Sequence, residues 1–170
     1  MSKIKAGASF PSFSWPKTTG ETVTPADHGG WRFLTIYRGK HCPLCKQYLT
    51  ELNGMQEDFK AADISVWALS ADPLERARSQ AEEEGWTIPI LAELTEDQMR
   101  AMRLYISSPR SADETDRNFA EPATFVINPQ GEIQIVDISN APFSRPDLTG
   151  ILKGIRFVAA KDYPIRGIVE

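Results

Sequence analysis

The sequence predicts an α/β fold with a central mixed β-sheet flanked by helices and an amino-terminal extended arm or hairpin. An apolar strand at residues 31–37 is followed by a tight turn and a helix, and a second apolar strand at 64–70 follows that helix. This order is typical of a right-handed unit with two parallel strands. Two later strands, 123–127 and 133–138, are joined by a turn containing Pro and Gly, as in an antiparallel hairpin. Parallel and antiparallel pairs together predict a mixed sheet in one domain, residues 1–170.

The amino-terminal arm and the first helix are each predicted by simple local patterns. Residues 7–28 are rich in Pro, Ser, Thr and Gly, and their prolines confine them to edges and turns, which predicts the arm. The helix after the first strand carries apolar residues at spacings of three and four, which predicts one buried face. Asn53 and Gly54 interrupt this pattern and predict a bend or an early end. The expected face consists of Leu44, Tyr48, Leu52, Met55 and Phe59.

The next helix has a predicted start and stop. We expect Asp72 to cap it, Pro73 to occupy its first position and Gly85 to end it. The short apolar run 88–91 contains Pro89, which predicts a strand at the edge of the sheet.

The remaining segments differ in how clearly they are patterned. Thr95 and Gln98 form the pattern of a capping box, which predicts a third helix that runs through Leu104. Residues 105–121 are polar and mixed, and we expect a loop with at most one helical turn. Periodic apolar residues at 145–160 predict the last helix. Its expected inner face contains Leu148, Ile151, Leu152, Ile155 and either Val158 or Ala159.

Composition excludes several classes of partner. The formal net charge is −4, and Lys and Arg are scattered, so the chain lacks the basic face that nucleic acid binding requires. No apolar run approaches the length of a membrane span, and the first ten residues lack the apolar core of a secretory signal. We therefore expect a cytoplasmic protein. In that reducing compartment a C-x-x-C pair is usually catalytic or redox-sensing.

Both cysteines of the chain, Cys42 and Cys45, lie at the expected start of the first helix. A disulfide between them would close a small ring and so would stabilise the fold little, which favours a chemical role. If Cys42 is the N-cap and Pro43 the first helical residue, the helix dipole favours a thiolate at Cys42. Cys45, one turn into the helix, would be less exposed but close enough to attack Cys42. Arg38, Lys40, His41 and Lys46 add positive charge nearby.

Other uses of a C-x-x-C pair fit less well. A zinc site needs two more ligands, and the chain offers no third cysteine and only His28 and His41. Covalent haem attachment is excluded because Lys46, rather than His, follows Cys45. We therefore expect neither a metal nor a cofactor. A buried, inert pair is the remaining structural alternative to a redox pair.

The order of elements and several motifs resemble the thioredoxin fold, and more closely the alkyl hydroperoxide reductase and thiol-specific antioxidant (AhpC/TSA) family of peroxiredoxin-like redoxins. The resemblance covers nearly the whole chain and implies a thioredoxin-like fold and a thiol-based oxidoreductase. The segments that carry it are Phe-Pro-Ser-Phe at 10–13, and residues 37–46, 69–73, 88–91, 122–131 and 161–164.

The resemblance to peroxiredoxins implies that Cys45 is the peroxidatic cysteine, but the positions around it differ from the family pattern P-x-x-x-T-x-x-C. Cys42 stands in the threonine position, Arg38 in the proline position, and Pro122 in the position of an arginine. Arg38 or Arg117 would have to reach the pocket to replace that arginine.

The same positions resemble a thioredoxin-type exchanger, in which Cys42 would be the exposed nucleophile and Cys45 the resolving thiol. Pro122 would then correspond to the cis-proline that faces the disulfide, the alternative being an ordinary trans proline. Glu121 would place a negative charge beside the disulfide and influence the choice of partner. Ile36 replaces the buried acid of thioredoxins, so deprotonation of Cys45 would rely on water or His41.

Three functions follow from these observations. The first is a thiol-disulfide oxidoreductase in which Cys42 attacks a substrate disulfide and Cys45 resolves the mixed disulfide. The second is a thiol peroxidase in which Cys45 attacks the peroxide and Cys42 condenses with the sulfenic acid. The third is a non-catalytic redox-sensing module. The expected partners are a protein or small-molecule disulfide, or a peroxide, together with a thiol reductant, and a homodimer is left open.

Overall fold

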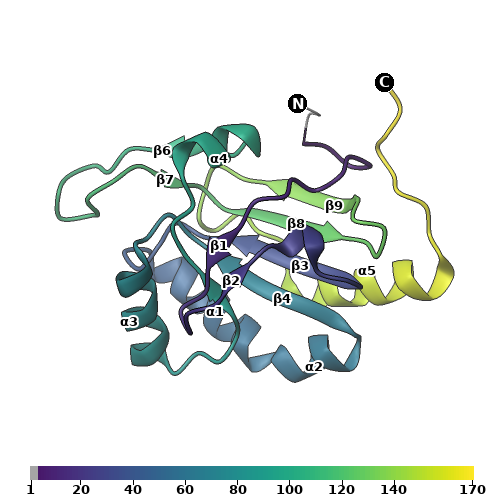
Figure 1. Ribbon diagram of the computed structural model, residues 1–170, viewed down its shortest axis with the longest axis horizontal. Helices are drawn as coiled ribbons and strands as arrows, with labels where there is room; N and C mark the ends of the chain where they lie inside the picture. Colours follow the sequence, from purple (N-terminus) through teal and green to yellow (C-terminus); the bar gives the residue numbers. More distant parts are fainter. Residues whose placement is uncertain (1–3) are drawn as a thin grey trace.

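The computed structural model describes residues 4–170, and its centre is a mixed sheet with the strand order β5-β4-β3-β8-β9 (Figure 1). β3 pairs in parallel with β4 and antiparallel with β8, so both predicted kinds of pairing are present. The strands of this sheet are β3 (Trp31–Ile36), β4 (Ile64–Leu69), β5 (Ile90–Leu91), β8 (Ala123–Ile127) and β9 (Ile133–Ile138).

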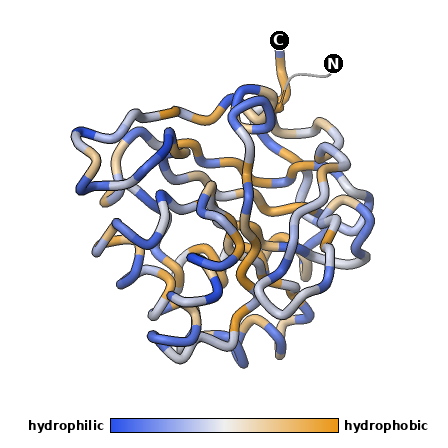
Figure 2. The backbone as a smooth tube through the Cα atoms, turned by 60° about the vertical axis from the view of Figure 1, so that its left-hand side comes forward, coloured by the Kyte–Doolittle hydropathy of each residue, from blue (hydrophilic) through white to orange (hydrophobic). Residues whose placement is uncertain are grey.

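Helices cover one face of the sheet, and the amino-terminal arm covers the other together with a short helix. On the first face Phe33 and Val126 pack against residues of α1, α2, α3 and α5. On the second face Leu34 and Phe125 pack against the arm and α4. Figure 2 shows the hydrophobic segments gathered in the centre of the molecule. The helices are α1 (Pro43–Gly54), α2 (Gln56–Ala61), α3 (Leu74–Glu84), α4 (Glu96–Ala101) and α5 (Leu148–Lys161).

Several local predictions are confirmed. The arm contains a hairpin of β1 (Trp15–Pro16) and β2 (Thr22–Val23). α1 ends at Gly54, and Gly85 ends α3 in the left-handed conformation with φ 64°. The capping box of Thr95 and Gln98 opens α4.

The buried face of α1 differs from the prediction. Cys45, Leu49 and Leu52 are its buried residues, whereas Leu44 is 40% exposed. Two apolar series at spacings of three and four run along this helix. The series that contains Cys45 and Leu49 is the one that is buried. The predicted stripe therefore contained the wrong first residue and omitted Leu49.

Other boundaries also differ. Asp72 is not the cap of α3, because Pro73 is the N-cap and the helix begins at Leu74. α4 ends at Ala101 rather than at Leu104, and α5 begins at Leu148 after the N-cap Asp147, whose carboxylate accepts a bond from the Gly150 N–H. The expected loop at 105–121 contains a small antiparallel pair, β6 (Ile106–Ser107) and β7 (Phe119–Ala120).

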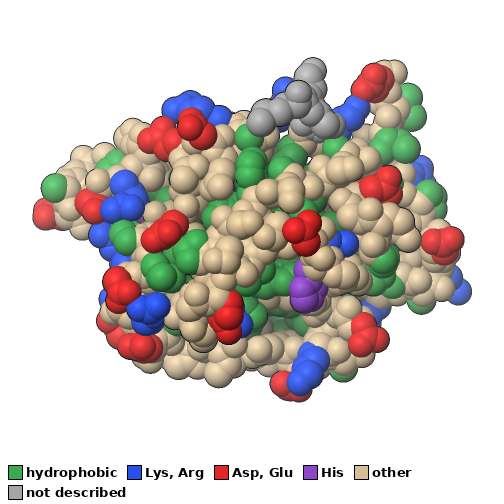
Figure 3. Space-filling model, viewed as in Figure 1, with side chains coloured by type: hydrophobic (Ala, Val, Ile, Leu, Met, Phe, Trp, Pro, Cys, Tyr) green, Lys and Arg blue, Asp and Glu red, His purple; other side chains and the backbone are tan. Residues whose placement is uncertain are grey.

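The charged surface agrees with the composition. On the face drawn in Figure 3, Lys and Arg side chains interleave with Asp and Glu around a partly apolar centre. None of the described helices has both the length and the hydropathy needed to cross a bilayer.

Candidate active site

Cys42 and Cys45 form a disulfide across the first turn of α1, with their Cα atoms 5.3 Å apart. Cys42 is the N-cap of the helix, and Pro43 occupies the first helical position as the sequence predicts. The backbone N–H of Cys45 donates a hydrogen bond to the Sγ of Cys42 at 3.2 Å. The sulfur of Cys42 thus fills the role that a Ser or Thr oxygen has at many helix starts, and the disulfide is compatible with an intact first turn.

Neither cysteine is exposed in this disulfide form. Cys42 is 2% exposed and Cys45 is fully buried, and both belong to the core beneath the sheet. The expectation that Cys42 is an exposed nucleophile is therefore wrong for the oxidised protein. The loop before the cysteine pair and the segment before α5 both contribute side chains to this region.

Arg145, which the sequence did not indicate as a site residue, makes a polar side-chain contact to the redox pair. Its Nη2 donates a hydrogen bond to the Sγ of Cys45 at 2.7 Å, across a separation of 100 residues. Its Nε and Nη1 are buried without a hydrogen-bond partner among the described residues. Burial lowers the pKa of Arg145 to about 10, which leaves the guanidinium charged at neutral pH. No motif in the sequence marked this residue, because it lies in irregular chain between β9 and α5.

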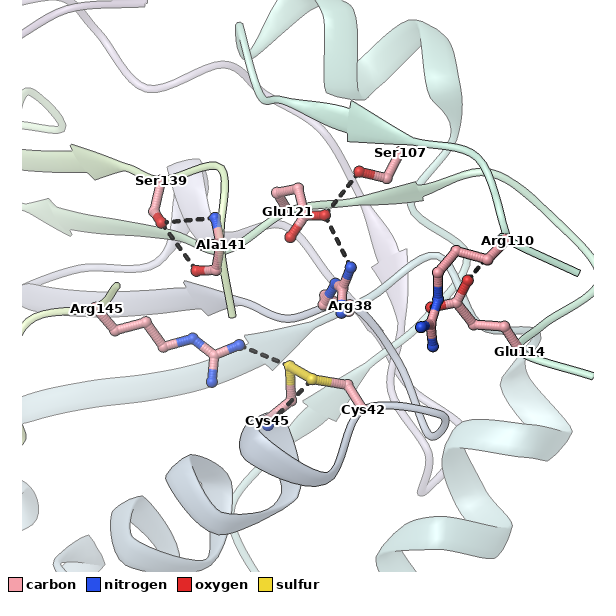
Figure 4. Close-up of polar contacts among 10 residues, drawn as sticks. All are labelled: Arg38, Cys42, Cys45, Ser107, Arg110, Glu114, Glu121, Ser139, Ala141 and Arg145. Atoms are coloured by element: carbon pink, nitrogen blue, oxygen red, sulfur yellow. Dashed lines mark hydrogen bonds and ion pairs between the residues drawn. A yellow bond between two sulfur atoms is a disulfide. The ribbon is translucent and has the colours of Figure 1, made fainter. Parts of the chain in front are cut away.

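Arg38, predicted to support the site, lies beside Glu121, predicted to bind the substrate and influence the choice of partner. The Nη2 of Arg38 donates to the Oε1 of Glu121 at 3.1 Å, and the hydroxyl of Ser107 donates to the same oxygen at 2.6 Å. The guanidinium of Arg38 also lies over the Phe119 ring, 4.9 Å from its centroid. Figure 4 shows Arg145 and the Arg38–Glu121 pair on two different sides of the disulfide.

Glu121 is 4% exposed, and its Oε2 has no hydrogen-bond partner among residues 4–170. Because Arg38 pairs with this carboxylate, much of its positive charge is compensated. Arg145 therefore carries the uncompensated guanidinium charge beside the sulfurs.

The loop before Cys42 is held by Asp72, which is buried after β4. Its Oδ2 accepts a hydrogen bond from the backbone N–H of Lys40 at 2.7 Å. Gly39 has φ 138°, and a Cβ there would lie 2.8 Å from the Oδ1 of Asp72. Asp72 thus anchors the loop instead of capping α3. The side chain of Lys40 pairs with Glu83 of α3 at 2.8 Å, so it is directed to that helix rather than to the sulfurs.

His41 packs on Phe119, with ring centroids 4.6 Å apart. Neither of its ring nitrogens has a hydrogen-bond partner in the described part of the chain. Burial lowers the pKa of His41 below its ordinary value, so the ring is neutral at neutral pH and does not add the expected positive charge. The side chain that contacts Cys45 Sγ belongs to Arg145 rather than to His41.

Two further expectations are corrected here. The peptide bond before Pro122 is trans, so this residue does not reproduce the cis-proline of thioredoxins. Arg117 forms an ion pair with Asp116 at 3.0 Å on the surface, and the arginine that reaches the sulfur is Arg145.

A polar cavity of about 850 Å³ lies beside the loop that precedes Cys42. Lys40, His41 and Arg76 line one part of it, and residues 110–116 of the β6–β7 connection line another. Within the described residues, no group of three or more His, Cys, Asp or Glu side chains is arranged to hold a metal ion.

Known proteins resemble this chain in sequence and in fold. Residues 6–136 match the model of the AhpC/TSA family. The chain is 27% identical to peroxiredoxin Bcp of Escherichia coli strain K12 over 137 residues, which cover 80% of this chain and 86% of that protein.

Two solved structures extend the similarity of the fold. The crystal structure of peroxidoxin BcpB from Mycobacterium tuberculosis has a TM-score of 0.72 at 16% identity and covers 95% of this chain and 99% of that one. A mutant of peroxiredoxin 6 from Arenicola marina has a TM-score of 0.79 at 19% identity, with 94% and 76% of the two chains covered. The thioredoxin-like fold predicted from the sequence is confirmed by these matches.

Proposed function

Because the chain belongs to the AhpC/TSA family of thiol-based peroxidases, we propose that it is a thiol peroxidase in which Cys45 is peroxidatic and Cys42 resolving. This assignment reverses the order of reaction that the C-x-x-C spacing first favoured. The family relationship supports reaction with peroxides, and the contacts of the two sulfurs support the choice of Cys45.

The observation that carries the assignment is the hydrogen bond from Arg145 Nη2 to Cys45 Sγ at 2.7 Å. A guanidinium beside a sulfur stabilises the thiolate and so lowers the pKa of the thiol. Cys42 Sγ, by contrast, accepts a bond from a neutral backbone N–H. The charged donor thus favours Cys45 as the thiolate that reacts first. The N–H groups of Arg145 that have no partner within residues 4–170 are suited to bind peroxide oxygens.

The reaction then proceeds in two steps. The Cys45 thiolate attacks one oxygen of the hydroperoxide, the O–O bond breaks, and the alkoxide takes a proton and leaves as an alcohol, or as water when the substrate is hydrogen peroxide. Cys45 becomes a sulfenic acid. The guanidinium of Arg145 stabilises negative charge that develops on the leaving oxygen.

In the second step the sulfur of Cys42 attacks the sulfur of the sulfenic acid. The S–O bond breaks, the hydroxide takes the Cys42 proton and leaves as water, and the disulfide forms. Two thiols of a reductant then supply two electrons and two protons to restore both cysteines. Such a reductant fits the cytoplasmic compartment expected from the sequence.

Disulfide exchange remains the second candidate, because Cys42 at the helix N-cap is where a helix favours a thiolate. The two candidates differ in which sulfur reacts first. We would mix the reduced wild type, Cys42→Ser and Cys45→Ser with hydrogen peroxide in a stopped-flow instrument and follow tryptophan fluorescence. Sulfenic acid would be trapped with dimedone and located by mass spectrometry.

A peroxidase requires that Cys42→Ser still forms one sulfenic acid, on Cys45, at a rate close to that of the wild type. Cys45→Ser should then lose rapid reaction with peroxide. If Cys45→Ser instead reacts quickly with a model protein disulfide and traps it on Cys42, while the wild type consumes peroxide slowly, the protein is an exchanger.

A further inference from the structure

Tyr48 lies one helical turn after Cys45 on α1 and contacts Arg145 in two ways. The Arg145 guanidinium lies over the Tyr48 ring, with its Cζ 4.8 Å from the ring centroid. The Tyr48 hydroxyl donates a hydrogen bond to the backbone carbonyl of Pro146 at 2.8 Å. One side chain of α1 therefore holds both the charged end of Arg145 and the backbone of the next residue.

This support matters because Arg145 lies in irregular chain. β9 ends at Ile138 and α5 begins at Leu148, so no helix or strand fixes the backbone of Arg145. An arginine side chain also loses rotamer freedom when it is held in one position. Cation–π contact with an aromatic face and a hydrogen bond to the adjacent carbonyl both offset this loss.

The spacing of Cys45 and Tyr48 on α1 places the aromatic ring next to the redox pair. Residues three apart on a helix are neighbours on its surface. Cys45 and Tyr48 thus present the sulfur and the aromatic ring side by side, and Arg145 contacts both. Both contacts therefore depend on the position of the same guanidinium.

We propose that Tyr48 is a positioning residue that holds the Arg145 guanidinium against the Sγ of Cys45 in the peroxidase reaction. This inference rests on the proposed function, and it adds the residue that sets the position of the guanidinium. Burial raises the pKa of Tyr48 well above its ordinary value, so its hydroxyl remains a donor throughout the neutral and mildly alkaline range.

The test measures the pKa of Cys45 and its rate of reaction with hydrogen peroxide in the full chain carrying Cys42→Ser. Thiolate absorbance at 240 nm against pH gives the pKa, and stopped-flow fluorescence gives the rate. Tyr48→Phe removes only the hydroxyl and should lower the rate roughly threefold to tenfold, as loss of one neutral hydrogen bond does. Tyr48→Leu also removes the ring and should lower the rate roughly tenfold to a hundredfold, with the Cys45 pKa raised by about one unit.

Tyr163 offers a matched control. Its ring also lies beside a guanidinium, 5.7 Å from the Cζ of Arg166, and its hydroxyl accepts a bond from that arginine. Both residues follow α5, near the carboxyl end of the chain (Figure 1). Tyr163→Leu should leave the pKa and the rate of Cys45 within twofold of their starting values.

A double-mutant cycle separates positioning from general packing. In an Arg145→Met background, Tyr48→Leu should change the Cys45 pKa no further, because the group it positions is gone. The proposal is overturned if Tyr48→Leu and Tyr48→Phe keep their α-helical circular dichroism and also keep the starting pKa and rate.

The pKa measurement distinguishes this failure from failure of the proposed function. If the wild type proves unreactive toward peroxide, the peroxidase assignment fails, yet a raised Cys45 pKa in Tyr48→Leu would still support the positioning of Arg145. An unchanged pKa would overturn the role of Tyr48 in either case.

Discussion

Arg145 and Cys45 lie 100 residues apart in the chain, and a guanidinium N–H of the first donates to the sulfur of the second at 2.7 Å. The resemblance to peroxiredoxins implies that Pro122 stands where that family has an arginine. The guanidinium that contacts Cys45 comes from the segment between β9 and α5. Arg145 lies in irregular chain, outside every strand of the sheet.

Replacement of Arg145 should therefore slow the reaction with peroxide. Arg145→Met removes a charged hydrogen bond, whose contribution is about 1.5–3 kcal/mol, and we expect a loss of roughly tenfold to 150-fold in the second-order rate constant. Arg145→Lys retains the charge but not the planar fork, and its loss should be smaller. Stopped-flow kinetics with hydrogen peroxide measure both.

Arg117→Met is the control for this prediction, because Arg117 is paired with Asp116 on the surface. It removes the same charge and should keep the wild-type rate. An Arg145→Met protein that reacts as fast as the wild type would contradict the role given to the guanidinium.

The contact between Gly39 and Asp72 should make Gly39 intolerant of a side chain. Gly39 has φ 138°, and an added Cβ would lie 2.8 Å from Asp72 Oδ1. We expect Gly39→Ala to reduce the free energy of unfolding by about 1–3 kcal/mol, measured by urea denaturation of the oxidised protein.

Gly20 provides a matched comparison because it also has a positive φ, 112°, but no atom within 4 Å of an added Cβ. Gly20→Ala reports the backbone strain alone, so it should cost less than Gly39→Ala. Equal losses for the two variants would mean that the Asp72 contact contributes nothing.

Much of the fold could be predicted because its strands and helix ends have local causes. The apolar strands 31–36 and 64–69, the stop at Gly85 and the capping box at Thr95 each follow from a few adjacent residues. The redox pair could be located in the same way, since Cys42 and Pro43 define a helix start by themselves.

The errors concern properties that depend on distant parts of the chain. Asp72 is followed by Pro73, as a helix cap often is, but its carboxylate is used by the Lys40 N–H instead. β6 and β7 contain two residues each, too few to show a period, and they form only because the chain brings them together. Arg145 could not be predicted because its partner, Cys45, lies 100 residues away in the chain and the two meet only in the folded protein.

The buried face of α1 can be tested by alanine substitution. Leu49 is fully buried, so Leu49→Ala should lower the free energy of unfolding by about 2–5 kcal/mol. Leu44 is 40% exposed, and Leu44→Ala should change it by less than about 0.5 kcal/mol. Urea denaturation gives both values. A larger loss for Leu44→Ala than for Leu49→Ala would support the buried face predicted from the sequence.

The burial of His41 should make stability depend on pH. Burial is the main cause that lowers the pKa of His41, with Arg38 and Arg76 acting in the same direction and Asp72 and Glu114 opposing them. The unfolded chain, with a histidine pKa of about 6.5, then binds more protons in mild acid than the folded protein does. Above pH 6.5, His41 therefore does not reduce the free energy of unfolding. As the pH falls from 6.5 toward the folded-state pKa of His41, the free energy of unfolding decreases progressively.

His41→Phe should keep the packing on Phe119 and reduce the loss of stability between pH 7 and pH 5. Urea denaturation at a series of pH values measures this slope in the variant and in the wild type. Titration of the His41 ring protons by NMR gives the folded-state pKa directly, and the His28→Gln variant leaves only one histidine signal to assign. A His41 pKa at or above 6.5 would contradict the neutral ring, and its charge would then have to be added to that of Arg145 beside the disulfide.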